Sequence, residues 1–145
     1  MISVAELDRI ARARLEDAKA LLQAGRFDGA TYLCGYAVEV ALKARICRTL
    51  NWPEFPNTNR EFESYRSFQT HDLDVLLRLS GQEARIKGQH LKLWSEVVRW
   101  KAEWRYNVIR TMEGPDDLLG FAYGIAKSRE AEAMIQAAEA LLKIL

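Results

Sequence analysis

Residues 28–49 constrain the fold most, because they are apolar on nearly every side from Gly29 to Leu42. A helix on the surface of a globular protein has one apolar stripe, whereas a helix that is apolar all round belongs in the interior. Glu39 is the one charged residue in that run. The sequence therefore predicts a central, buried helix that carries a single carboxylate.

The remainder of the chain also favours helices over strands. Ala, Glu, Lys, Leu and Arg make up about half of the 145 residues, a composition typical of helical proteins. Val, Ile and Thr are too few for a sheet-dominated domain. We predict an all-α, single-domain, up-and-down bundle of about five helices that spans residues 1–145.

Apolar spacing and turn residues place the five helices. Gly25 closes the first, and Thr70 is a candidate N-cap of a short third helix that Gly81 ends. Residues 51–70 contain two prolines and three asparagines, which predicts a long loop of the kind that is usually functional or mobile. The expected helices are residues 3–24, 28–49, 70–80, about 89–112, and 115 to the C-terminus.

The charge of the chain and its cysteines indicate where the protein is located and which kinds of site it can contain. The net charge of +1 argues against nucleic-acid binding through bulk charge. The N-terminus has no signal-peptide pattern, and no apolar run is long enough to cross a bilayer, so we expect a soluble, cytoplasmic protein. Cys34 and Cys47 fall roughly 20 Å apart on one helix, so we expect two reduced core cysteines and neither a metal site nor a cofactor.

The near-neutral total hides a basic region, because residues 85–110 carry a local charge of +5 and the rest carries −4. Projected on one helix, Lys92 pairs with Glu96 and Arg99 with Glu103 on a solvated face. Lys101 projects instead onto the apolar face, together with Arg105.

Two cations on an apolar face need a partner, since a buried unpaired charge costs several kcal/mol. One interpretation is a buried Glu39–Arg105 ion pair that joins the second helix to the fourth. The other is a polar cleft in which Glu39, Lys43, Lys101 and Arg105 receive an anionic ligand such as a nucleotide phosphate.

The apolar arc of the expected fourth helix is about 180° wide, more than the ~100° stripe that one core requires. A two-fold contact lets one patch pair with itself, so the arc predicts a symmetric homodimer.

Three segments in order carry a family resemblance: GATYLCGYAVEVALKARI (29–46), THDLDVLL (70–77) and WRY (104–106). Over roughly residues 5–140 the chain resembles the HEPN family, whose name means higher eukaryotes and prokaryotes nucleotide-binding. The resemblance implies a dimeric five-helix bundle that binds nucleotide or nucleic acid, often beside a minimal nucleotidyltransferase partner in toxin–antitoxin systems. Many such proteins are metal-independent endoribonucleases.

The nuclease signature of that family is Arg, four to six residues, then His. In the alignment that the resemblance implies, Arg105 is the arginine of this motif. Its histidine would then stand at position 110, 111 or 112, but these residues are Arg, Thr and Met. Arg66 with His71, and Arg85 with His90, also fit the spacing. His90 projects onto the apolar arc as a packed histidine, whereas His71 lies where the long loop enters the third helix.

Three functions are therefore open. The first is a nucleotide-binding or nucleic-acid-binding homodimer whose cleft uses Glu39, Lys43, His71, Lys101, Arg105 and Tyr106. The second is an endoribonuclease with Arg66 and His71 as catalytic residues. The third is an adaptor that displays loop aromatics to a protein partner, namely Trp52, Phe55, Phe62 and Phe68.

Overall fold

The computed structural model describes residues 1–106 and 118–145, with the side chains of residues 1–104 and 125–145. The all-α helical bundle is confirmed, with six α-helices in this part of the chain. The helices are α1 (Val4–Gln23), α2 (Phe27–Leu50), α3 (Leu73–Leu79), α4 (Glu83–Gln89), α5 (Leu91–Val97) and α6 (Leu118–Ile144). Between them lie the 3-10 turns η1 (Glu61–Ser64), η2 (Arg66–Phe68) and η3 (Ala102–Tyr106), and the short strands β1 (Ile2–Ser3) and β2 (Glu54–Phe55).

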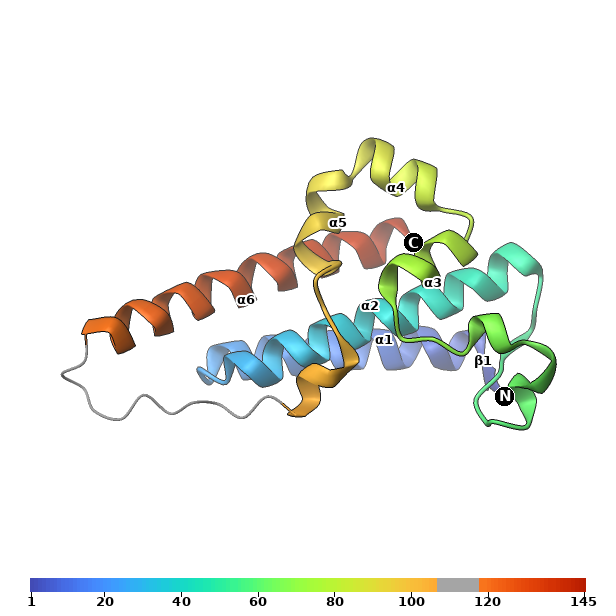
Figure 1. Cartoon of the computed structure of the whole chain (residues 1–145), viewed down its shortest axis with the longest axis horizontal. Coiled ribbons are helices and arrows are strands. Elements are labelled where there is room, and N and C mark those ends of the chain that lie inside the picture. The colour runs from blue at the N-terminus through green and yellow to red at the C-terminus, as the bar shows by residue number, and fades with distance from the viewer. Residues whose placement is uncertain (107–117) are drawn as a thin grey trace.

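Three long helices run along the molecule, and three short ones cover one side of it (Figure 1). α1 lies antiparallel to α2, and α6 runs in the same direction as α2. α3 packs against α2, and α5 packs against α6. Over the described ranges, none of the helices combines the length and apolar character that a bilayer crossing requires.

α2 is the central helix that its sequence predicts. Its core positions are buried nearly continuously from Ala37 to Leu42, and Glu39 lies among them with 1 % of its surface exposed. Cys34 and Cys47 are both buried and unpaired, as expected. Burial raises the pKa of the Cys34 thiol to about 12, which leaves it uncharged at neutral pH.

Glycine ends two helices where the sequence predicted a stop. Gly25 after α1 and Gly81 after α3 adopt positive φ angles of 72° and 73°, the left-handed conformation that favours glycine. The start of α3 differs from expectation, because Asp72, not Thr70, caps it by accepting hydrogen bonds from the backbone of Asp74 and Val75. Thr70 instead accepts from the Asp72 N–H.

The segment of residues 51–70 is folded onto the bundle. β2 pairs antiparallel with β1, and η1 and η2 follow it. Phe55 and Phe62 are buried, and the Trp52 ring packs edge-on against Tyr65 at 4.9 Å between centroids. The sequence prediction of an irregular loop missed these elements because short turns and two-residue strands have no sustained period.

The prediction of one fourth helix over residues 89–112 is wrong within the described residues. Helical structure begins earlier, at Glu83, bends at His90 between α4 and α5, and ends at Val97. The chain then leaves the α-helix before η3. Lys101 lies after the end of α5, so the helical face on which it was expected among apolar residues is not formed. Arg99 lies 3.7 Å from Glu130 of α6 instead of pairing with Glu103. The remainder of the expected helix, residues 107–112, lies outside the described residues.

Trp100 explains where that helix is interrupted. Its indole rests on the bare backbone of α2 at Gly35, where an added Cβ would overlap the ring. The indole N–H donates a 3.0 Å hydrogen bond to the carbonyl oxygen of Tyr32. A continued α-helix would direct residue 100 elsewhere, so this buried contact competes with helical geometry and replaces it.

We predict that Gly35→Ala destabilises the fold, because the new methyl group overlaps the Trp100 indole and the ring must leave its site. Overpacking of this kind costs about 1–3 kcal/mol or more. Denaturant unfolding measures the change. Gly88→Ala is the matched control, since nothing lies within 4 Å of a Cβ there and alanine favours the α4 helix. Equal stability of Gly35→Ala and the wild type would contradict the contact.

Candidate functional site

The buried Glu39 carboxylate lies between two basic side chains. Its Oε1 accepts a hydrogen bond from Lys43 Nζ at 2.6 Å, one helical turn further along α2. The same oxygen lies 2.9 Å from Nδ1 of His71. A carboxylate can only accept, so the histidine donates from Nδ1, and in the neutral imidazole Nε2 is then an acceptor. Lys43 is 17 % exposed and His71 is 65 % exposed, so a chain of polar groups leads from the core to the surface.

The second oxygen of Glu39 has no hydrogen-bond partner among the described residues, although it is buried. Nearly all buried polar atoms in proteins are satisfied, so such an atom calls for an explanation. The charge also acts on its neighbour Tyr36, whose phenol pKa is raised first by burial and then by Glu39. The second oxygen of Glu39 can therefore accept a hydrogen bond beyond those from the described residues.

Local sequence chemistry sets His71 in this position. The Asp72 side chain caps α3, and the Thr70 hydroxyl binds the Asp72 backbone, so the turn on both sides of His71 is defined by hydrogen bonds. Leu73, the next residue, is buried. The histidine is thereby held at the entrance of α3, with Nδ1 directed at α2.

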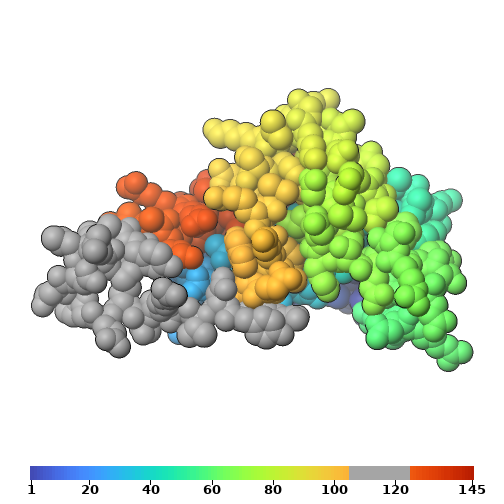
Figure 2. Space-filling view, in the orientation of Figure 1, coloured from blue at the N-terminus to red at the C-terminus, as the bar shows by residue number. Residues whose placement is uncertain are grey.

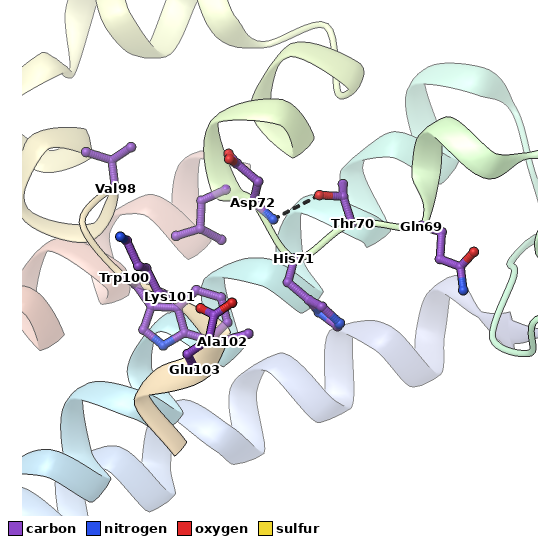
Figure 3. Close-up of a pocket in the computed structure, with 10 residues that line it drawn as sticks. Gln69, Thr70, His71, Asp72, Val98, Trp100, Lys101, Ala102 and Glu103 are labelled. Carbon is purple, nitrogen blue, oxygen red and sulfur yellow. Dashed lines mark hydrogen bonds between the residues drawn. The ribbon is translucent and has the colours of Figure 1, made fainter. Parts of the chain in front are cut away.

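A cavity of about 570 Å³ opens beside this histidine. One wall is the segment that enters α3, and the other is the segment between α5 and η3 (Figure 3). These two segments lie next to each other on one face of the molecule (Figure 2, green and orange). The lining residues are Gln69, Thr70, His71, Asp72, Leu73, Val98, Trp100, Lys101, Ala102 and Glu103.

The cavity wall is polar but not strongly cationic. Lys101 is exposed at the rim, and Asp72 and Glu103 line the same cavity. Hydroxyl and amide groups of Thr70 and Gln69 add donors and acceptors. Such a mixture suits a neutral, hydrogen-bonding group better than an isolated phosphate.

Two of the expected cleft residues, His71 and Lys101, line this cavity. Glu39 is in direct contact with Lys43 and with His71, but neither Glu39 nor Lys43 is among the lining residues. The side chains of Arg105 and Tyr106 lie outside the described residues, and so does the proposed Glu39–Arg105 pair. Among the described residues, Lys43 and His71 are the partners of the Glu39 carboxylate.

Arg66 and His71 do not share this cavity. Arg66 begins η2 and lines a neighbouring cavity, which also holds Arg60. His90 is half-buried at the junction of α4 and α5, and Arg85 donates instead to the backbone oxygen of Ile144. In neither of the two Arg–His pairs that fit the nuclease spacing do both residues line either of these two cavities.

Sequence reasoning did not anticipate the direct Glu39–His71 contact or the roles of Trp100 and Gln69. Gly35 within an apolar helix was the available signal for a close approach. Gln69 carried no pattern of its own. In the described part of the chain, no group of three or more His, Cys, Asp or Glu side chains could hold a metal ion.

Comparison with protein families supports the resemblance from the motifs. Residues 4–58 match the HEPN domain family, a stretch that includes α1, α2, Glu39 and Lys43. His71, Arg66 and Lys101 lie beyond the matched residues. Neither curated proteins nor solved structures gave a match.

We predict that neutral His71 carries its proton on Nδ1, because the Glu39 carboxylate accepts from that nitrogen. Nitrogen-15 NMR of the neutral imidazole distinguishes the two tautomers. In Glu39→Gln the amide no longer requires this tautomer, so the population of the Nδ1–H form falls. His90 serves as the internal reference in the same spectra, and a wild-type His71 protonated mainly at Nε2 would contradict the contact.

Proposed function

We propose that this chain is a HEPN-domain protein over residues 1–145 that binds a nucleotide or nucleic acid in the His71 cavity. In this proposal it works as a homodimer and is the partner of a minimal nucleotidyltransferase in a toxin–antitoxin-like system. Glu39, Lys43, His71, Lys101, Arg105 and Tyr106 are the proposed ligand-binding residues.

The observation that carries the proposal is the buried Glu39 carboxylate, which directs a surface histidine toward a polar cavity of nucleoside size. His71 Nε2 can accept from a ligand hydroxyl or amino group, and Lys101 can donate to an acceptor of the ligand at the rim. The HEPN match over α1 and α2 supports the ligand class. The excess apolar arc that suggested dimerisation falls partly on residues outside the described ranges, so the homodimer rests on the family resemblance.

Calorimetry with ATP, AMP and short RNA tests the binding proposal. We expect His71→Gln and Lys101→Gln each to weaken binding about tenfold, which corresponds to about 1.4 kcal/mol and to the loss of one hydrogen bond. His90→Gln and Lys92→Gln are matched controls, because neither residue lines the cavity. Equal losses in the control variants, or no binding of any of the three ligands, would reject the proposal.

A second candidate is a metal-independent endoribonuclease with His71 as its acid or base. The Glu39–His71 contact favours it, since a carboxylate that orients an imidazole is a recurrent arrangement in acid–base catalysis. Arg66 was the expected second catalytic residue, and it lines the neighbouring cavity, so an RNA strand would have to reach both. The adaptor alternative has no such support, because Phe55 and Phe62 are buried and Trp52 and Phe68 pack against the core.

Labelled RNA incubated with the protein in EDTA separates catalysis from binding. If His71 is catalytic, cleavage proceeds without metal and falls at least a hundredfold in His71→Ala, within the range that acid–base groups contribute. His90→Ala keeps full activity as the control. Absence of cleavage of any RNA leaves binding alone as the function.

A further inference from the structure

A second cavity of about 450 Å³ adjoins the first. Arg60 and Arg66 line it, and neither guanidinium group has an ion-pair or hydrogen-bond partner among the described residues. Glu63 is the single acid in the lining, so its charged residues sum to +1. The complete lining is Asn59, Arg60, Phe62, Glu63, Arg66 and Gln69.

The backbone that carries these arginines is held in place. Gln69 Nε2 donates a 2.8 Å hydrogen bond to Asn59 Oδ1, which ties the two ends of the segment together. Phe62 lies between the two arginines in sequence and is buried against the Phe55 ring at 6.0 Å. Arg60 and Arg66 therefore project from an ordered backbone segment, so a ligand that binds them does not have to order the segment as well.

Gln69 lines both cavities, so the two are neighbours across one side chain. Their charges differ in kind. In the His71 cavity, Lys101, Asp72 and Glu103 sum to −1, whereas the two arginines and one acid of the second cavity sum to +1. Arginine presents a planar fork of donors that matches phosphate oxygens.

We propose that the Arg60–Arg66 cavity is a phosphate subsite of the nucleotide site, with the nucleoside in the His71 cavity and Gln69 between them. The inference rests on the proposed function and adds where the phosphate lies. The phosphate is either the terminal phosphate of a mononucleotide or the internucleotide phosphate of a single strand. Both present the same tetrahedral anion to the two guanidinium groups.

Calorimetry with adenosine, AMP, ATP and the dinucleoside monophosphate ApA tests the subsite. In the wild type, a phosphate-bearing ligand binds at least fivefold more tightly than adenosine. Arg60→Gln and Arg66→Gln each remove most of that gain and leave adenosine binding unchanged. A gain restricted to AMP and ATP identifies a mononucleotide tail, and a gain restricted to ApA identifies a strand.

Arg9→Gln is the matched control, because Arg9 is an exposed arginine of α1 that lines neither cavity. Equal losses of affinity in Arg9→Gln and Arg66→Gln would show that the net charge of the protein causes the effect, and would overturn the subsite. So would an equal affinity of the wild type for adenosine and for all three phosphorylated ligands. Circular dichroism of the variants confirms that these exposed substitutions leave the fold intact.

Pyrophosphate distinguishes a failure of the subsite from a failure of the proposed function. If no nucleoside or nucleotide binds but pyrophosphate binds and loses affinity in Arg66→Gln, the subsite stands and the nucleotide proposal falls. If nucleotides bind through His71 and the arginine variants behave like Arg9→Gln, the nucleotide proposal stands and the phosphate subsite is rejected. A wild type that binds neither pyrophosphate nor a nucleotide rejects both.

Discussion

A carboxylate inside the most buried helix is the constraint on which the site depends. Glu39 is almost fully removed from water on α2, and a buried charge is tolerated only when opposite charges and hydrogen bonds compensate it. Lys43 provides the compensation from the same helix, and His71 adds a donor from the next part of the chain. The need to satisfy one acid therefore joins the entrance of α3 to the centre of the bundle.

A second constraint acts on the opposite wall of the cavity. Trp100 packs against the backbone of Gly35 and donates to Tyr32, which draws the chain after α5 down onto α2. Burial of an indole and its hydrogen bond outweighs the continuation of a helix whose next residues face solvent. Both walls of the His71 cavity are thus attached to α2, four residues apart, at Gly35 and at Glu39.

Much of the architecture could be read from local chemistry. The burial of α2, the stops at Gly25 and Gly81 and the reduced cysteines follow from composition and backbone preference, and the structure confirms them. The prediction of a single helix over residues 89–112 was wrong within the described residues. The apolar spacing there fits a helix, but the contact of Trp100 with α2 interrupts it. The small elements between residues 51 and 70 were missed, since aromatic burial against the bundle, and not a repeating pattern, holds them.

The candidate site divides in the same way. By itself the sequence determined the fold class, the lone acid in the central helix and Lys43 one turn beyond it, because these depend on residue type and helical spacing. Only the tertiary structure decided that His71 meets Glu39, that Lys101 is an exposed residue of the cavity lining, and that Arg66 lines a separate cavity. Long-range contacts are set by the packing of whole helices and turns against one another. The spacing of residues along one helix contains no information about that packing.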